Sequence, residues 1–175
     1  MSLAAKNLSV FENEIIPDAS SMRFGIVVSE WNHEITTALY DGAFQTLIKY
    51  GAKTDNIKKM NVPGSFELTS GARYFAEDHQ TDAVICLGCV IQGETKHFDF
   101  ICMAVANGLT QLGILFSKPF IFGVLTTNDQ QQAKDRSGGS HGNKGVEAAV
   151  TAIKMLAEKK RLTDEYNLKR KKAGF

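Results

Sequence analysis

Long apolar runs and a surplus of either charge are both missing from this sequence. No stretch approaches the ~18 consecutive apolar residues that a membrane-spanning helix needs, and residues 1–18 contain no basic segment followed by an apolar one. The chain carries 20 Lys and Arg residues against 19 Asp and Glu residues, which argues against a basic nucleic-acid surface over the whole domain. These absences predict a cytoplasmic protein that interacts with neither a membrane nor nucleic acid.

Cysteine is also scarce, and its spacing favours packing over chemistry. Cys86, Cys89 and Cys102 are an odd number in a chain of 175 residues, which is large enough to form a hydrophobic core without disulfides. Cys86 and Cys89 match the C-x-x-C pattern of metal and redox sites. However, the surrounding apolar run predicts a strand, on which residues three apart point to opposite faces, and no second cysteine pair completes a zinc site. We therefore expect reduced thiols, with Cys86 and Cys89 packed in the core, and no metal.

Two kinds of apolar segment alternate along the chain, in which 43% of the residues are hydrophobic. Short β-rich runs are each followed by a segment with helix-like spacing, and Gly51 marks the expected end of the first helix. This alternation predicts an α/β protein with a parallel sheet covered on both faces. The expected strands are residues 23–28, 56–62, 82–91 and 119–126. The expected helices are residues 33–50, 63–79, 96–116, 128–136 and 146–159.

The two ends of the chain lie outside this alternation. Residues 1–22 are expected to form an N-terminal arm, whose apolar residues suit a strand that pairs with a neighbouring subunit. Residues 23–160 form the predicted single domain. Residues 161–175 form a basic tail that is either solvated or in contact with nucleic acid or an acidic surface, and we favour solvation.

The first residues after each expected strand are candidates for a ligand site, because ligands of parallel sheets bind beyond the carboxyl ends of the strands. After the first strand come Trp31 and Asn32, where Trp31 either covers the edge of the core or stacks on a flat heterocycle. After the second strand, residues 63–67 are expected to open a helix. Glu67 is either a helix-start charge or a carboxylate that binds hydroxyl groups of a ligand.

The turn after the third strand has the sequence Gly-Glu-Thr-Lys-His. Gly93 allows close approach to the backbone, and the N–H groups of Glu94 and Thr95 are expected to begin a helix that favours an anion such as phosphate. His97 follows within the first helical turn. It is either a helix-face histidine bonded to Asp99 or to the backbone, or a proton carrier beside the anion pocket.

The fourth turn leads to a glycine-rich segment that contains Arg136 and Lys144. Its glycines and lysine resemble a phosphate-binding G-x-x-x-x-G-K-[ST] loop, but Asn143 separates Gly142 from Lys144 and no strand is expected before the segment. Arg136 is either a surface charge or a residue that grips a phosphate group with two donors. Lys144 would act as a point charge.

The order and spacing of these motifs are more specific than any one of them. They read WN at 31–32, PGSFE at 63–67, GCVIQGETKHFDF at 88–100, FGVLTTND at 122–129 and RSGGSHGNKGVEAA at 136–149. Together they resemble lumazine synthase, the family that catalyses the penultimate step of riboflavin biosynthesis, over about Arg23 to Lys159. The resemblance implies a flavodoxin-like three-layer sandwich with a central four-stranded parallel sheet flanked by helices.

The resemblance also implies a reaction and the residues that perform it. The reaction is a transferase condensation of 5-amino-6-(D-ribitylamino)uracil with 3,4-dihydroxy-2-butanone 4-phosphate to 6,7-dimethyl-8-ribityllumazine, phosphate and water. It moves protons without redox chemistry, so neither a cofactor nor a metal is expected. His97 would be the catalytic proton shuttle, and the phosphate site would comprise Glu94, Thr95 and Arg136. The residues implied for the pyrimidine and its ribityl chain are Trp31, Asn32, Ser65, Phe66, Glu67, Cys89, Val90, Ile91, Phe122 and Lys144.

By this resemblance, Trp31 stacks on the pyrimidine, residues 65–67 hold the ribityl chain, and the backbone of residues 89–91 bonds to the pyrimidine. In this family Phe122 and Arg136 come from the adjacent subunit, so the resemblance implies a homo-oligomer. The assembly would be a pentamer or a shell of 60 subunits, with riboflavin synthase as a candidate partner.

Three positions depart from the usual pattern of the family. Trp31 replaces a common phenylalanine with a larger ring that keeps the same role. Gln92 stands where a basic residue is frequent, and Glu94 places a carboxylate near the expected phosphate, so we expect a lower affinity for phosphate. The alternative functions are a paralogue that binds flavin or lumazine without catalysis and a shell protein.

Overall fold

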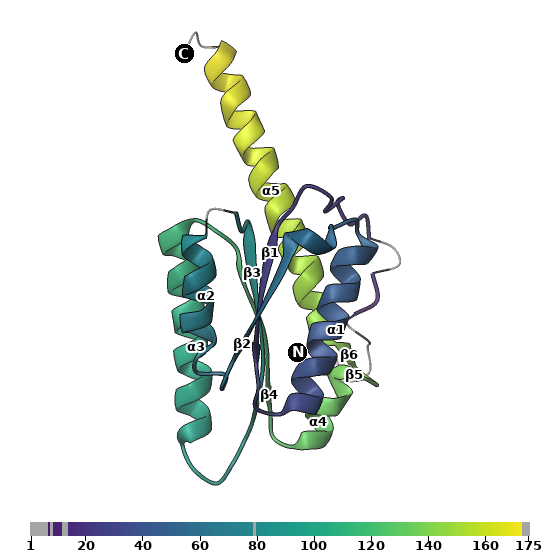
Figure 1. Ribbon diagram of the computed structural model, residues 1–175, viewed down its shortest axis with the longest axis vertical. Coiled ribbons are helices and arrows are strands. Elements are labelled where there is room, and N and C mark those ends of the chain that lie inside the picture. The colour runs from purple at the N-terminus through teal and green to yellow at the C-terminus, as the bar shows by residue number, and fades with distance from the viewer. Residues whose placement is uncertain (1–6, 8, 12–13, 79, 173–175) are drawn as a thin grey trace.

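The computed structural model describes residues 7, 9–11, 14–78 and 80–172. Four strands in these residues form one parallel sheet with the order β2-β1-β3-β4 (Figure 1). The strands are β1 (Phe24–Ser29), β2 (Ile57–Val62), β3 (Ala83–Ile91) and β4 (Phe120–Thr127). Each lies where an apolar run predicts it, and the predicted parallel sheet is confirmed.

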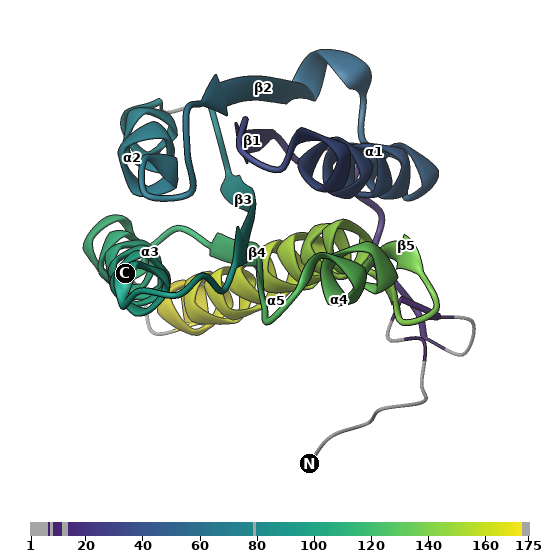
Figure 2. The ribbon, with the colours of Figure 1, turned by 90° about the horizontal axis from the view of Figure 1, so that it is seen from below.

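Helices cover both faces of the sheet, which confirms the flavodoxin-like three-layer sandwich (Figure 2). The helices on one face are α1 (His33–Lys49), α4 (Gln130–Asp135) and α5 (Lys144–Lys172), and those on the other are α2 (Leu68–Glu77) and α3 (His97–Phe116). A 3-10 helix, Thr54–Asn56, leads into β2. Gly51, at φ 97°, directly follows the C-cap of α1, as the sequence predicts.

The two central strands are apolar on both faces because helices cover them on both sides. Every residue of β1 is buried, and so are the first seven residues of β3. In contrast, β2 lies at an edge of the sheet and exposes Lys58 and Lys59. Charged residues at an edge oppose pairing with another chain.

Cys86 and Cys89 point to opposite faces of β3, as strand geometry predicts. Cys86 belongs to the core beside α2 and α3, whereas Cys89 belongs to the core beside α1 and α5. Both thiols are free. Burial raises the pKa of the Cys89 thiol to about 11 and also raises the pKa of Cys86. The two residues therefore pack the core and cannot share a metal ion.

The C-terminal helix is longer than the sequence pattern predicts. We expected it over residues 146–159, whereas α5 continues to Lys172. The sequence has no Gly or Pro from 146 to 172 that would end the helix, and Arg161 forms ion pairs with Glu158 and Glu165 on adjacent turns. The predicted basic tail is therefore helical up to Lys172.

A short hairpin that the sequence pattern did not predict lies within the glycine-rich segment. β5 (Ser137–Gly139) and β6 (Gly142–Asn143) pair antiparallel, and Gly142 adopts a φ of 85°, a conformation that favours glycine. Asn143 Nδ2 donates to Ala38 O at 2.9 Å, which ties the hairpin to α1. Asn143, which breaks the phosphate-loop pattern, thus has a structural role.

The described part of the N-terminal arm contains no strand. Two of its residues contact the domain: Ala19 N–H donates to Tyr50 O at 2.8 Å, and Ser9 Oγ donates to Asn143 O at 3.0 Å. Pairing of the arm with a neighbouring subunit stays a prediction. The rest of the predicted arm lies outside the described residues.

Helix α3 leaves an apolar surface uncovered in the single chain. Its exposed side chains include Phe100, Met103, Ile114 and Leu115, which expose between 61% and 77% of their surface. Among the described residues, α3 alone is long and apolar enough to cross a membrane by length and composition. One such helix is weak evidence for a membrane span, because helices of soluble proteins pass the same test.

Candidate active site

A cavity of about 600 Å³ opens at the carboxyl end of the sheet, between the turns that follow β1, β2 and β3. It contains every residue implied for the pyrimidine and the ribityl chain except Phe122 and Lys144, and it also contains His97. The residues that line it are Trp31, Asn32, Gly64, Ser65, Phe66, Glu67, Cys89, Val90, Ile91, His97 and Ile101. The sequence reasoning missed Gly64 and Ile101 as lining residues.

Hydrogen bonds between the turns hold this cavity in shape. Glu30 N–H donates to Val62 O at 2.8 Å, which joins the turn after β1 to the end of β2. Asn32 Nδ2 donates to Cys89 O at 2.9 Å and so joins the same turn to β3. Asn32 has left-handed backbone angles, φ 58° and ψ 47°, which asparagine adopts more readily than most residues. The three turns therefore form one connected rim.

Two aromatic rings at this rim are open to solvent. Trp31 exposes 73% of its surface and Phe66 exposes 56%. A Trp that covers the core edge would be buried, so the exposure favours the alternative role of Trp31 as a stacking surface. Apolar side chains of Val90, Ile91 and Ile101 line the same cavity. Such a site suits a flat heterocycle with one polar edge.

Glu67 occupies the N-cap position of α2, but its side chain does not cap the helix. The predicted helix begins later than expected, at Leu68, because Glu67 N–H and Leu68 N–H form turn hydrogen bonds to Gly64 O and Ser65 O, both at 3.2 Å. The Glu67 side chain makes no capping hydrogen bond to α2. Its carboxylate is therefore free to face the cavity and accept hydrogen bonds from a ligand.

The turn after β3 also differs from the expectation. Glu94 and Thr95 form a bend before α3, because the first hydrogen bond of the helix runs from Phe100 N–H to Lys96 O at 3.3 Å. The expectation that their N–H groups begin the helix is therefore wrong. Both residues are exposed, and neither lines the cavity. Any phosphate held here would meet a loop followed by a helix N-terminus.

His97 is the first residue of α3, and its exposed side chain lines the cavity. The backbone N–H of His97 donates to Thr95 Oγ1 at 3.4 Å. Within the described residues, the His97 ring forms no hydrogen bond with Asp99 or with the backbone, the two partners of its alternative role. The ring lines the cavity and so lies within reach of a ligand bound there.

Arg136 and Lys144 lie outside the cavity of their own chain. Both form ion pairs with Glu147, at 2.8 Å for Arg136 Nη2 and 3.1 Å for Lys144 Nζ. Arg136 Nη1 also donates to His141 O at 2.7 Å. These bonds hold the guanidinium in one orientation beside the hairpin. The sequence reasoning missed Glu147, and its position three residues after Lys144 at a helix start was the available signal.

Phe122 also does not line the cavity of its own chain. It lies on β4 and packs against the core cluster beneath α2 and α3. The structure therefore brings together the pyrimidine and ribityl residues with His97, but not Phe122, Lys144 or Arg136.

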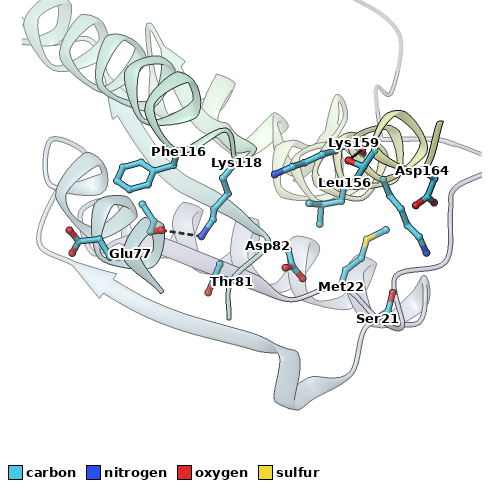
Figure 3. A pocket seen from close by; sticks show the side chains of 13 residues that line it. Ser21, Met22, Glu77, Thr81, Asp82, Phe116, Lys118, Leu156, Lys159 and Asp164 are labelled. Carbon is cyan, nitrogen blue, oxygen red and sulfur yellow. Dashed lines mark hydrogen bonds between the residues drawn. The ribbon is translucent and has the colours of Figure 1, made fainter. Parts of the chain in front are cut away.

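A larger cavity of about 890 Å³ lies away from the predicted site, beside Asp82 and Lys118 ahead of β3 and β4 (Figure 3). Several of its charged groups already have protein partners. Lys118 Nζ donates to the carbonyls of Phe75, Ala76 and Asp78 at 3.2 Å, and Lys159 Nζ donates to Ser117 O at 2.6 Å. Burial lowers the pKa of Lys118. These contacts stabilise the ends of α2 and α3.

Among the described residues, no group of three or more His, Cys, Asp or Glu side chains could hold a metal ion.

The fold and the first cavity define a class of protein. It is an α/β protein with a small-molecule site beyond the carboxyl ends of parallel strands, lined by aromatic rings, a carboxylate and a histidine.

Comparison with known proteins narrows this class. A sequence model of the 6,7-dimethyl-8-ribityllumazine synthase family matches residues 21–160. A curated protein of that name from Cytophaga hutchinsonii is 61% identical over 158 residues, covering 90% of this chain and 99% of the relative. Proteins of the same name from Parabacteroides distasonis and Porphyromonas gingivalis are 55% and 53% identical, covering 89% of this chain and 98% and 96% of the relatives. The chain belongs to the 6,7-dimethyl-8-ribityllumazine synthase family.

Proposed function

We propose that the protein is a transferase of riboflavin biosynthesis. It condenses 5-amino-6-(D-ribitylamino)uracil with 3,4-dihydroxy-2-butanone 4-phosphate to give 6,7-dimethyl-8-ribityllumazine, phosphate and water. Family membership over residues 21–160 supports this reaction. The observation that carries it is the composition of the cavity, where Trp31, Glu67 and His97 meet from three separate turns.

Each part of the cavity suits one part of the pyrimidine substrate. The exposed Trp31 ring offers a stacking surface for the heterocycle, and the backbone of residues 89–91 offers donors and acceptors at the end of β3. Ser65 and Glu67 offer a hydroxyl and a carboxylate for the ribityl hydroxyls. The cavity thus offers aromatic and polar groups for the heterocycle and polar groups for the ribityl chain.

His97 carries protons in this proposal. Imine formation, loss of phosphate and ring closure each move a proton, and the His97 ring is exposed to the cavity. A positioned acid–base group typically contributes ~10²- to 10⁴-fold to a rate, while holding two substrates together contributes further. The enzyme without His97 is therefore expected to be slower but still active.

The phosphate site requires a second copy of the chain in this proposal. Glu94 and Thr95 are exposed beside the cavity, whereas Arg136 and Phe122 lie away from it. The uncovered apolar face of α3 supports self-association. We propose a homo-oligomer, a pentamer or a shell of 60 subunits, in which a neighbour supplies Arg136 and Phe122. Riboflavin synthase is a candidate partner of that assembly.

The test is to mix the purified protein with both substrates and to follow lumazine formation optically against the uncatalysed background. We expect acceleration by the wild type, a lower kcat for His97→Ala, and a higher KM for the butanone phosphate in Arg136→Ala. His33→Ala is the matched control, because His33 is an exposed histidine at the first position of α1 and does not line the cavity.

The outcomes separate the enzyme from its alternative. An unchanged rate in His97→Ala would remove His97 from the proton-transfer role. If the wild type binds the pyrimidine but gives no acceleration, the protein is a binding paralogue, and Gln92 and Glu94 become the first positions to restore.

A further inference from the structure

One buried polar group near the cavity has no role in the site described above. Ser29 is the last residue of β1 and is 0% exposed. In the described part of the chain, its Oγ has no hydrogen-bond partner. A buried hydroxyl without a hydrogen bond costs stability, so its presence in a folded protein needs a reason.

Ser29 and the cavity residue Ser65 both lie next to Gly88. Val28 pairs with Leu87, so Ser29 and Gly88 come next at the same level of β1 and β3. A Cβ atom at Gly88 would lie 2.8 Å from Ser65 Oγ and 3.3 Å from Ser29 Oγ. Both hydroxyls therefore pack against Gly88, in the space that a side chain there would take.

We propose that Ser65, positioned by Ser29 and Gly88 behind it, forms a subsite of the cavity that recognises a hydroxyl group on the ligand's polyol chain. Ser65 Oγ meets the ligand hydroxyl, because Ser65 lines the cavity. A hydroxyl can donate one hydrogen bond and accept two, so in this proposal Ser65 also bonds to Ser29, whose Oγ packs against the same Gly88 position. Ser29 thereby orients the Ser65 hydroxyl.

Gly88 is a positioning residue in this subsite. An alanine Cβ would lie 2.8 Å from Ser65 Oγ and 2.9 Å from Leu68 Cδ1, so both side-chain ends would have to move. The expected damage is therefore to ligand recognition, together with some loss of stability because Leu68 is a core residue. The identity of the polyol as the ribityl chain rests on the proposed function.

Removing the Ser29 hydroxyl separates this role from a purely structural one. Ser29→Ala deletes an unpaired buried hydroxyl, so the protein should be at least as stable as the wild type. We expect the same variant to bind 5-amino-6-(D-ribitylamino)uracil about 3- to 10-fold more weakly. An analogue with an n-alkyl chain in place of the ribityl chain should bind as it does to the wild type. Calorimetric titration and thermal unfolding measure the two effects.

Gly88→Ala provides an independent variant with its own control. We expect KM for the ribityl pyrimidine to rise about 3- to 10-fold, while kcat changes less than about twofold. Gly123→Ala is the control: its Cβ would meet Leu87 Cδ2 at 2.6 Å and Cys86 O at 3.0 Å, and Gly123 does not line the cavity. That variant should lose stability with KM unchanged.

If Ser29→Ala weakens binding of the ribityl compound but not of the alkyl analogue, the subsite is supported. The same result in Gly88→Ala assigns the role of Gly88. Unchanged binding, or equal weakening of the ribityl and alkyl compounds, overturns it. If Gly88→Ala does not fold, Ser29→Ala decides alone. Because binding is measured with the pyrimidine alone, a wild type that prefers the ribityl compound but forms no lumazine refutes the proposed function and leaves the subsite supported. A wild type without that preference overturns the subsite.

Discussion

Asn32 combines two features at the turn between β1 and α1. Its backbone is left-handed, with a φ of 58°, and its side chain holds the carbonyl of Cys89 at 2.9 Å. The first feature turns the chain into α1, and the second connects that turn to the strand expected to face the pyrimidine. At the scale of the residue, Asn32 therefore acts both on folding and on the shape of the cavity.

Two substitutions of Asn32 separate these effects. We expect Asn32→Ala to lower the free energy of unfolding by about 1–2 kcal/mol, because alanine is strained in the left-handed conformation, and to weaken pyrimidine binding. Asn32→Gly tolerates the backbone conformation but lacks the bond to Cys89 O, so it should lose less stability and still bind weakly. Urea unfolding and ligand titration measure both. Wild-type affinity in Asn32→Gly would exclude a role for the Cys89 contact.

The end of α2 illustrates how elements are held together. Asp78, the C-cap residue of α2, accepts hydrogen bonds from Lys58 Nζ on β2 and from Gln80 N–H, both at 2.9 Å. Lys118, from the loop before β4, donates to the carbonyls of the last turn. The end of α2 is thus connected to β2 and to the loop before β4, and β2 and β4 are the two edge strands of the sheet.

This arrangement predicts a pH dependence of stability. The hydrogen bond from Lys58, followed by that from Gln80 N–H, lowers the pKa of Asp78 from 3.8 to about 2. A carboxylate whose pKa is lowered by folding stabilises the folded state at pH values above its ordinary pKa. That contribution is lost as the pH falls from about 4 toward about 2. We therefore expect Asp78→Asn to unfold at a lower temperature than the wild type near pH 7, with the difference shrinking toward zero near pH 2. Thermal unfolding of both proteins across this range measures it.

Asp164→Asn serves as the control for this series, because Asp164 is exposed on α5. It should follow the wild type at each pH. A difference between Asp78→Asn and the wild type that stays constant with pH would contradict the role of the Asp78 charge.

At the scale of the whole molecule, the proposed site is incomplete in one chain. His97 lines the cavity, whereas Arg136 pairs with Glu147 away from it. The exposed apolar surface of α3 would be covered if copies of the chain assemble through it. Catalysis and assembly are therefore linked in the proposed function.

Mixed oligomers test this link. His97→Ala and Arg136→Ala are each expected to be impaired alone. If a site takes His97 from one chain and Arg136 from its neighbour, co-expression of the two variants in equal amounts restores roughly one quarter of the sites. The specific activity of the mixture should then exceed the mean of the two separate variants. Activity equal to that mean would place both residues in the site of a single chain.

Much of the architecture could be predicted because it depends on local patterns. The apolar runs that became β1 and β3, and the stop of α1 at Gly51, follow from periodicity and from glycine. The β5–β6 hairpin could not be predicted in this way, since it is too short for periodicity and depends on the contact of Asn143 with α1. The length of α5 was underestimated because its last turns are stabilised by charged pairs and not by apolar spacing.

By itself, the sequence determined the succession of strands and helices along the chain. It also determined which turns carry polar and aromatic residues after each strand. Both features depend on residues that are neighbours in the sequence. Only the tertiary structure decided which of these residues meet. It packed Ser29 and Ser65 against Gly88, paired Arg136 with Glu147, and left Phe122 outside the cavity. The physical reason is that these contacts join segments far apart in the chain. They depend on how the sheet aligns the strand ends and on how the helices pack against it, and no local pattern contains that information.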